Sequence, residues 1–308
     1  MGASPVHLLR QGPVVWSLLK AATKGPGKEG PGIGDATLPG PVLTANLPPR
    51  NAAMVRDYIR LVGGDPSWYR GAVPPHLFPQ WGFPLLASTL GPLSYDMRRI
   101  LNAGCKMEIH RPLPADQPLN IEAQLMSVDD NGKRALLTER LLTGTDEAPG
   151  AIECHATALV PLPRDKGADG TEPQAKKEKK ERPRVPEGAR EIHRWKLSPT
   201  SGRDFAFVTG DINPIHWVAA YGKMAGFKGR IAHGFSGMAR LAESLNRQLW
   251  SGDVSRLASL EVRFVRPLRL PAKVGVYVDD EGGCFVGDAP GGPAYFSGTY
   301  TERTTDDE

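Results

Sequence analysis

Residues 235–264 read FSGMARLAESLNRQLWSGDVSRLASLEVRF, and the hydrophobic period changes within this stretch. From Phe235 to Leu249 the apolar residues recur at helical spacing, which predicts an amphipathic helix from about residue 235 to 250. From Leu260 to Phe264 apolar and charged residues alternate, which predicts a strand. A long helix followed directly by a strand is therefore the unit from which the fold is predicted.

The same order of elements is expected in both halves of the chain. In the second half, further strands are expected near residues 274–278, 284–288 and 294–302. In the first half, the helix candidate runs from Phe83 to Leu101, and alternating segments follow at 105–109 and 119–125. Asn131-Gly132 indicates a hairpin turn before a strand over Arg134–Leu142. This pattern predicts an α+β fold, with an antiparallel sheet wrapped around a central helix in each half.

Two landmarks occur in the same order in both halves. RDFAFVTGD at 203–211 is similar to RDYIRLVGGD at 56–65, and VRFVRPL at 262–268 is similar to MEIHRPL at 107–113. We interpret them as the remains of a duplicated unit of roughly 110 residues, with chance similarity as the alternative. The predicted boundaries are an N-terminal arm over 1–42, a degenerate domain over 43–162, a charged linker over 163–190 and a catalytic domain over 191–308. Within the arm, residues 12–23 predict a short amphipathic helix that packs on the body or lies on a surface.

Composition excludes several classes of protein. The chain has 308 residues, 40% hydrophobic and 23% charged, with a net charge of +4, much of it from the segment 175–184. This mild excess does not indicate nucleic-acid binding, and no segment is long and apolar enough to predict membrane insertion. The three cysteines form no paired motif, so we expect them to be buried strand residues of a protein in a reducing, cytoplasmic compartment.

The stretch TGDINPIH at 209–216, followed by RIAHG at 230–234, carries the chemistry. Asn213 before Pro214 is a helix start, and we expect that helix to run to about Ala225. Asp211 on the entering loop and His216 in the first turn can then meet at one point. A helix N-terminus favours neutral imidazole, so the two side chains can hold and activate one water molecule.

Gly234 and three less specific residues complete the site predicted from the residues themselves. Gly234 lies at the start of the 235–250 helix, where free backbone N–H groups can stabilise an oxyanion. Lys223 and Arg230 either meet the phosphates of a bound substrate or are solvated surface charges. His233 either orients the loop or only packs. No metal and no cofactor are expected, because no nucleotide-binding or GxSxG motif occurs and five histidines lack a partner at metal-ligand spacing: His7, His76, His110, His155 and His193.

These motifs resemble the signature of the MaoC-like, (R)-specific enoyl-thioester hydratases. The resemblance implies a double hot-dog fold, with one degenerate and one catalytic copy of the unit. It implies Asp211, His216 and Gly234 as catalytic residues, Asn213 as the motif asparagine, and CoA or an acyl carrier protein as the carrier of the substrate. The first half departs from this pattern because Arg70 stands where histidine is expected. In that half Phe78, Trp81 and Phe83 are expected to line the acyl tunnel.

The predicted function is reversible dehydration of (R)-3-hydroxyacyl thioesters, that is, hydration of trans-2-enoyl thioesters. Two alternatives stay open: an acyl thioesterase on the same fold, and a subunit that binds acyl thioesters without catalysis. The expected partners are the acyl-thioester substrate and, as one alternative, an acyl carrier protein. The chain is expected as a homodimer or as a monomeric pseudo-dimer.

Overall fold

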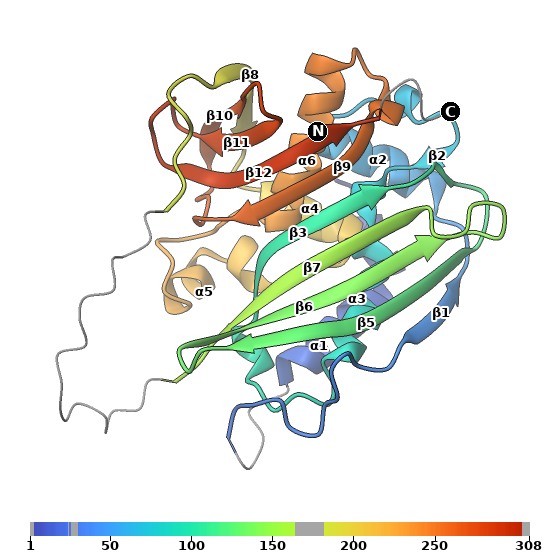
Figure 1. Cartoon of the computed structure of the whole chain (residues 1–308), viewed down its shortest axis with the longest axis vertical. Helices are drawn as coiled ribbons and strands as arrows, with labels where there is room; N and C mark the ends of the chain where they lie inside the picture. The colour runs from blue at the N-terminus through green and yellow to red at the C-terminus, as the bar shows by residue number, and fades with distance from the viewer. Residues whose placement is uncertain (1–2, 24, 26–29, 164–181, 304–308) are drawn as a thin grey trace.

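The computed structural model describes residues 3–23, 25, 30–163 and 182–303. In these residues ten strands form one continuous antiparallel sheet, with the order β1-β5-β6-β7-β3-β9-β12-β11-β10-β8 (Figure 1). A separate pair of short strands, β2 (Ala72–Val73) and β4 (Leu113–Pro114), lies beside it. Both halves of the chain therefore share one sheet.

The sheet is symmetric about the pair formed by β3 and β9. Met107 of β3 lies opposite Leu260 of β9, and each half continues outward from this junction in the same order of its own strands. This arrangement is what a duplicated unit predicts. The first half contributes β1 (Leu43–Leu47), β3 (Leu101–Ile109), β5 (Leu119–Asp130), β6 (Arg134–Gly144) and β7 (Ile152–Pro161), and the second half β8 (Arg190–Leu197), β9 (Leu257–Phe264), β10 (Ala272–Val278), β11 (Gly283–Gly287) and β12 (Ala294–Glu302).

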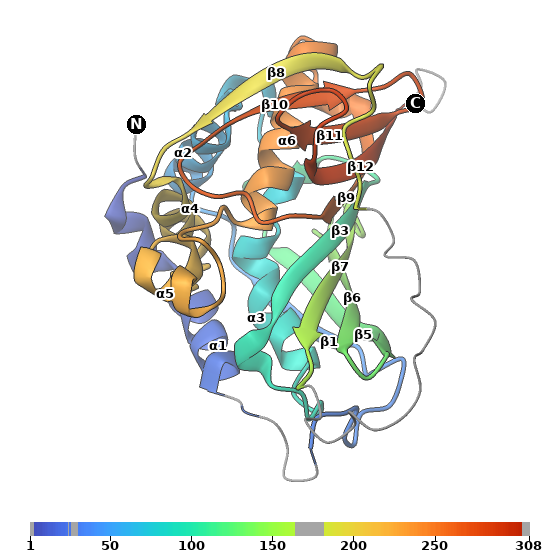
Figure 2. The ribbon, with the colours of Figure 1, turned by 90° about the vertical axis from the view of Figure 1, so that its left-hand side faces the viewer.

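The helices gather on one side of the sheet (Figure 2). Each half places one helix at its centre, α3 in the first and α6 in the second, and the sheet curves around both. Phe235 at the start of α6 contacts the rings of Phe78, Phe83 and Phe264, so one hydrophobic core joins the two halves. The helices are α1 (Gly12–Thr23), α2 (Ala52–Val62), α3 (Pro79–Thr89), α4 (Ser201–Thr209), α5 (Ala219–Met224) and α6 (Gly234–Leu249).

Residues 235–264 fold as predicted. The helix expected from 235 to 250 is α6, and the alternating segment after it is β9. The matched landmarks at 56–65 and 203–211 form the equivalent helices α2 and α4. Each helix ends at a glycine in the left-handed conformation, Gly63 with φ 97° and Gly210 with φ 81°.

The helix predicted from Phe83 to Leu101 is wrong in both bounds. The observed helix α3 begins at Pro79 and ends at Thr89, and Leu101 is already the first residue of β3. The intervening residues form a turn and the 3₁₀ segment η4 (Met97–Arg99), capped by the side chain of Asp96. The run looked helical because the buried residues of this segment, Leu90, Leu93 and Met97, recur at spacings close to the helical period.

The predicted arm and linker are both attached to the body where the structure describes them. The helix expected over 12–23 is α1, which packs on α3. Most of the predicted linker, residues 164–181, lies outside the described residues. Its last part does not behave as a free linker, because Val185 is buried against Tyr277 and Ala294.

Two further predictions concern cysteines and membranes. Cys105, Cys154 and Cys284 lie on strands, are buried and form no disulfide, as expected. In the part of the chain that the structure describes, every helix is too short or too polar to cross a bilayer.

Candidate active site

Asp211 enters the site from a tight turn at the end of α4. Gly210 adopts a positive φ there, and a side chain on it would collide with Val14 and Gln11 of the N-terminal segment. The backbone N–H of Asn213 donates to Asp211 Oδ1 over 3.4 Å, and only 5% of Asp211 is exposed. The turn and the N-terminal segment that covers it together fix the position of this carboxylate.

His216 lies in a short 3₁₀ segment, η5 (Pro214–His216), whose start is capped by Asn213 as predicted. The continuous helix expected up to Ala225 is wrong, because the chain is extended at Val218 and the next helix, α5, starts at Ala219. The Trp217 indole N–H donates to the carbonyl of Ile212 over 3.0 Å. This bond ties the chain back to the loop where the helix would otherwise continue.

The hydrogen bond made by His216 determines which of its nitrogens is free. Its Nδ1 lies 2.9 Å from the carbonyl oxygen of Ile231, and a carbonyl can only accept. Nδ1 therefore carries the hydrogen, and Nε2 keeps a lone pair that can accept a proton.

His233 connects the two catalytic candidates. Its ring stacks on that of His216 with centroids 3.6 Å apart and an interplanar angle of 26°. Its Nε2 lies 3.0 Å from the backbone carbonyl of Asp211, to which it donates, and 3.8 Å from Asp211 Oδ2. Of the two roles considered for His233, the structure favours orientation of the loop. Its position one residue before the helix glycine was the signal in the sequence.

Burial controls the charge of all three groups. Desolvation, followed by the neighbouring His233, lowers the pKa of His216 to about 3, although Asp211 and the Ile231 carbonyl oppose the shift. Desolvation also lowers the pKa of His233 to about 3. Desolvation raises the pKa of Asp211 above 3.8, while His216 and the backbone of Asn213 oppose it. Both imidazoles are therefore neutral near pH 7, and Asp211 is a stronger base than an exposed aspartate.

Gly234 is the first residue of α6, directly beside this group. A Cβ atom at this position would lie 2.5 Å from carbons of the Phe264 ring, so only glycine fits. The first amides of a helix have no partner inside the helix. The start of α6 therefore presents N–H donors at the wall where Asp211 and His216 meet.

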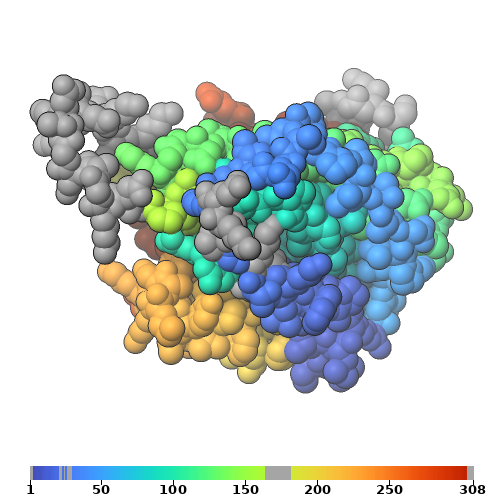
Figure 3. Space-filling view, turned by 90° about the horizontal axis from the view of Figure 1, so that it is seen from below, coloured from blue at the N-terminus to red at the C-terminus, as the bar shows by residue number. Residues whose placement is uncertain are grey.

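A cavity of about 440 Å³ opens at these residues and reaches into the first half. Its wall includes the catalytic candidates, Phe83 of α3, Glu139 of β6 and Leu18 and Leu19 of α1. Figure 3 shows the surface of the N-terminal segment next to that of the segment around α5, on one face of the molecule. The N-terminal arm thus completes the cavity wall.

The predicted binding residues divide into two groups. Asn213 and Phe83 lie in the cavity wall, as expected. Phe78 and Trp81 do not, because both are fully buried in the core: the Trp81 indole N–H donates to Thr143 of β6, and the Phe78 ring packs on Phe235 of α6. This corrects the expectation that they line the tunnel.

The predicted phosphate-binding cations lie outside this wall. Lys223 is exposed on α5, and Arg230 is half-buried in the loop that leads to His233. Arg98 and Arg266 line the cavity instead, and the sequence motifs gave no signal for either. Arg98 is already paired with Asp96 over 2.6 Å, and Arg266 donates to the carbonyls of Pro183 and Ala294.

Asp211, His216 and His233 are also the one group among the described residues with the composition and closeness of a metal site. Their ligand atoms lie within 4.8 Å of one another. Lone pairs of imidazole lie in the ring plane, and the two rings here are stacked face to face. Their lone pairs therefore lie in two nearly parallel planes and converge poorly on one ion. The geometry favours acid–base chemistry over metal binding.

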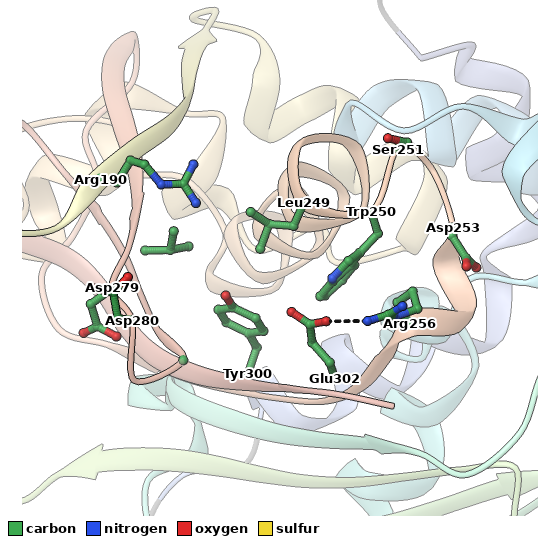
Figure 4. A pocket seen from close by; sticks show the side chains of 12 residues that line it. Arg190, Leu249, Trp250, Ser251, Asp253, Arg256, Asp279, Asp280, Tyr300 and Glu302 are labelled. Carbon is green, nitrogen blue, oxygen red and sulfur yellow. Dashed lines mark hydrogen bonds and ion pairs between the residues drawn. The ribbon is translucent and has the colours of Figure 1, made fainter. Parts of the chain in front are cut away.

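Two other hollows lack this arrangement. The first, about 720 Å³, lies at the C-terminal end of α6 and is lined largely by charged side chains, including the Arg256–Glu302 ion pair of 2.8 Å (Figure 4). The second, about 890 Å³, is the first-half counterpart of the candidate site. Arg70 lies in its wall at the position equivalent to His216, and the equivalent Asp65 is exposed and caps Ser67. This agrees with a degenerate first half.

Comparison with known proteins identifies relatives of part of the chain. Residues 177–288 match the family model described as MaoC-like domain. 3-Hydroxyacyl-thioester dehydratase X of Mycobacterium tuberculosis is 37% identical over 175 residues, which are 56% of this chain and 57% of that protein. The chain thus spans less than two thirds of the curated relatives that it matches, and 60% of the related dehydratase Y of the same organism.

Solved structures extend the similarity to both halves. The crystal structure of HtdX from Mycobacterium tuberculosis superposes with a TM-score of 0.66 at 19% identity, covering 85% of this chain and 100% of that one. A second protein from that organism, described as a double hot-dog fold, superposes with a TM-score of 0.55 at 14% identity, covering 89% and 99%. The chain therefore has the double hot-dog fold, and residues 177–288 of its second half form a MaoC-like domain.

Proposed function

We propose that this protein adds water to the double bond of trans-2-enoyl thioesters and, in the reverse direction, dehydrates (R)-3-hydroxyacyl thioesters. One observation carries the proposal: the Asp211 carboxylate and the free Nε2 of His216 line the same largely apolar cavity, beside the first amides of α6. The names of the related dehydratases support it.

Asp211 and His216 have complementary roles toward a single water molecule. One hydrogen of the water is donated to the Asp211 carboxylate and the other to Nε2 of the neutral His216. The water oxygen attacks C3 while Asp211 takes the proton, and the pair then returns a proton to C2. The net change is addition of hydroxide to C3 and of a proton to C2, so atoms and charge balance. Base catalysis of this kind contributes about 10²–10⁴-fold in rate.

The start of α6 acts on the other end of the reacting system. Attack at C3 moves electrons onto the thioester oxygen, which becomes an enolate. The amides next to Gly234 donate to that oxygen, and the absence of a side chain allows it to approach the backbone. One such donor is worth about 3 kcal/mol in other enzymes. The acyl chain extends along the apolar wall formed with the first half, and either CoA or an acyl carrier protein carries it.

The proposal is tested with the purified chain and crotonyl-CoA, a longer enoyl-CoA and the matching enoyl group on an acyl carrier protein. We expect the ultraviolet absorbance of the enoyl thioester to fall and chiral analysis to identify an (R)-3-hydroxyacyl product. Asp211→Asn and His216→Asn should each lower kcat/KM by about 10²-fold or more. Asp65→Asn and His110→Asn are the matched controls, because Asp65 and His110 are exposed.

Two outcomes would contradict the proposal. Full hydration activity in both Asp211→Asn and His216→Asn would remove these residues from the mechanism. Release of free thiol without hydration, followed with a thiol reagent, would assign the chain to the thioesterases instead.

A further inference from the structure

Glu139 is an acid in an otherwise apolar stretch of the cavity wall. It lies on β6 between the buried residues Leu137 and Leu141, at a position whose side chain faces inward. Only 5% of the residue is exposed, and it lines the same cavity as Asp211 and His216. The wall residues contributed by α3, by the residue that follows it and by β7 are Phe83, Leu86, Ala87, Leu90, Ala156 and Ala158.

The acid has a neutral partner and no cationic one. The Thr89 hydroxyl lies 2.7 Å from Glu139 Oε1, and among the described residues no lysine or arginine forms an ion pair with Glu139. Desolvation raises the pKa of Glu139 to about 8, and the bond to Thr89 only partly opposes this shift. Glu139 is therefore a neutral carboxylic acid at pH 7, with one hydrogen to donate and one oxygen to accept.

The hydroxyl of Thr89 shows which ligand group this acid suits. That hydroxyl also lies 2.8 Å from the carbonyl of Leu86, and its single hydrogen can serve only one of the two acceptors at a time. If Thr89 donates to Glu139, the acid hydrogen is free for the cavity. If Thr89 donates to Leu86, the acid donates to Thr89, and its second oxygen is free as an acceptor. A hydroxyl both donates and accepts, so it pairs with Glu139 in either case.

A plain hydrocarbon chain fits the part of the cavity beside Glu139 poorly. Lying against Glu139, it would displace solvent and leave a buried polar group without a partner, which costs about 1–3 kcal/mol. A site that offers a buried hydrogen-bonding group discriminates against chains that lack its counterpart more strongly than an apolar wall does.

We propose that Glu139, held by Thr89, recognises a hydroxyl group on the acyl chain, away from the thioester, so that the preferred substrates are hydroxylated enoyl thioesters. This inference rests on the proposed hydration activity and names its substrate class. Glu139 is a specificity residue here and takes no part in the reaction at C2 and C3.

The test compares pairs of enoyl-CoA substrates of equal length, one with a plain alkyl chain and one with a single hydroxyl moved stepwise along it. For the wild type, kcat/KM is expected to be roughly 10- to 100-fold higher with the hydroxyl at one position. Glu139→Leu should abolish or reverse this ratio, and Thr89→Val should reduce it. Glu139→Gln keeps a donor and an acceptor and should retain part of it.

Glu122→Gln is the matched control, because Glu122 is exposed on the neighbouring strand β5. This substitution should leave the ratio of kcat/KM between hydroxylated and plain substrates unchanged. Since the readout is a ratio within each variant, a general loss of activity does not produce the expected result. Thermal unfolding identifies any variant that fails to fold. A wild type without preference at any position, or an unchanged preference in Glu139→Leu, would overturn the inference.

Failure of the proposed function is distinguishable from failure of this inference. If crotonyl-CoA is not hydrated, the preference is measured by calorimetry as a ratio of dissociation constants. The ligands are saturated hydroxylated and plain acyl-CoA, and each is bound to the wild type and to Glu139→Leu. Tighter binding of the hydroxylated chain to the wild type alone supports recognition by Glu139 without turnover. Equal binding of both chains rejects it.

Discussion

The imidazole rings of His216 and His233 stack 3.6 Å apart, and His233 also holds the backbone of Asp211. A proton on either ring would lie against the other ring, away from solvent. Burial, and for His216 also the neighbouring His233, lowers the pKa of both rings and keeps them neutral, which leaves Asp211 as the charged member of the three.

The pH dependence of hydration follows from this arrangement. The pKa of His216 is lowered to about 3, and that of Asp211 is raised above 3.8. Because Asp211 must be ionised to act as base, kcat/KM should fall with a single limb as the pH drops through the pKa of Asp211. No limb from a histidine should occur between pH 6 and 7, where an exposed imidazole titrates. Measurement of kcat/KM from pH 4 to 9 checks this, and a limb near pH 6.5 that disappears in His216→Asn would contradict it.

Gly234→Ala tests the contact between α6 and Phe264. The added Cβ would lie 2.5 Å from the Phe264 ring, so the start of the helix or the ring must move. Displacement of the amides should lower kcat by about 10²-fold, the typical effect of losing one oxyanion donor. Phe264→Leu in the same chain makes room and should restore part of the activity. Gly188→Ala is the control, because nothing lies within 4 Å of its added Cβ, and an active Gly234→Ala enzyme would exclude the oxyanion role.

Glu139 should make stability fall as the pH rises. Its pKa is about 8 in the folded protein, against 4.5 for an exposed glutamate. Below pH 4.5 both states hold the proton. Above it, only the unfolded chain releases the proton until about pH 8, so the free energy of unfolding falls by up to about 1.4 kcal/mol per pH unit in that window.

Glu139→Gln cannot titrate and should remove this decline. Urea unfolding of the wild type and of Glu139→Gln at pH 5, 6.5 and 8 gives the difference directly, since contributions from the buried histidines are common to both proteins. A difference in unfolding free energy that stays constant over this range would show that Glu139 is already ionised at pH 5.

Gln11 joins the N-terminal arm to both halves. It is fully buried, its amide donates to the carbonyl of Val208 over 3.0 Å, and it accepts from Gln80 over 2.9 Å. Gln11→Met keeps the size of the side chain but leaves both partners unpaired, which should cost about 1–3 kcal/mol in the free energy of unfolding. Gln248→Met on the exposed face of α6 is the control, and equal urea midpoints for the two variants would show that the arm is not fastened at Gln11.

The parts of the fold that the sequence predicted are those set by local pattern. Helix α6 and strand β9 follow from hydrophobic periods that match their burial, and the landmarks matched at 56–65 and 203–211 form equivalent helices. The break between η5 and α5 depends on the bond of Trp217 to Ile212, a contact that no period reveals.

The site was predictable to the extent that its residues lie in one motif. Asp211, His216, Asn213 and Gly234 meet at the cavity because the chain between them is short. Phe78 and Trp81 were misassigned because the sequence does not distinguish an aromatic residue that lines a tunnel from one that packs in the core beside it. Glu139 comes from a distant strand, and its signal was a charged residue at an inward position of the alternating segment after the Asn131-Gly132 turn.

The pairing of β3 with β9 joins the two halves in a single sheet, although the halves contribute different kinds of residue to the cavity. Asp211, His216 and Gly234 belong to the second half, whereas Phe83, Glu139 and the apolar residues around them belong to the first. Under the proposed function, substitutions in the first half should therefore alter which acyl groups are accepted without touching the reacting atoms. Under the proposed function, two fused copies of one unit, of which one holds the reacting groups and the other shapes the cavity, allow selectivity to evolve separately from chemistry.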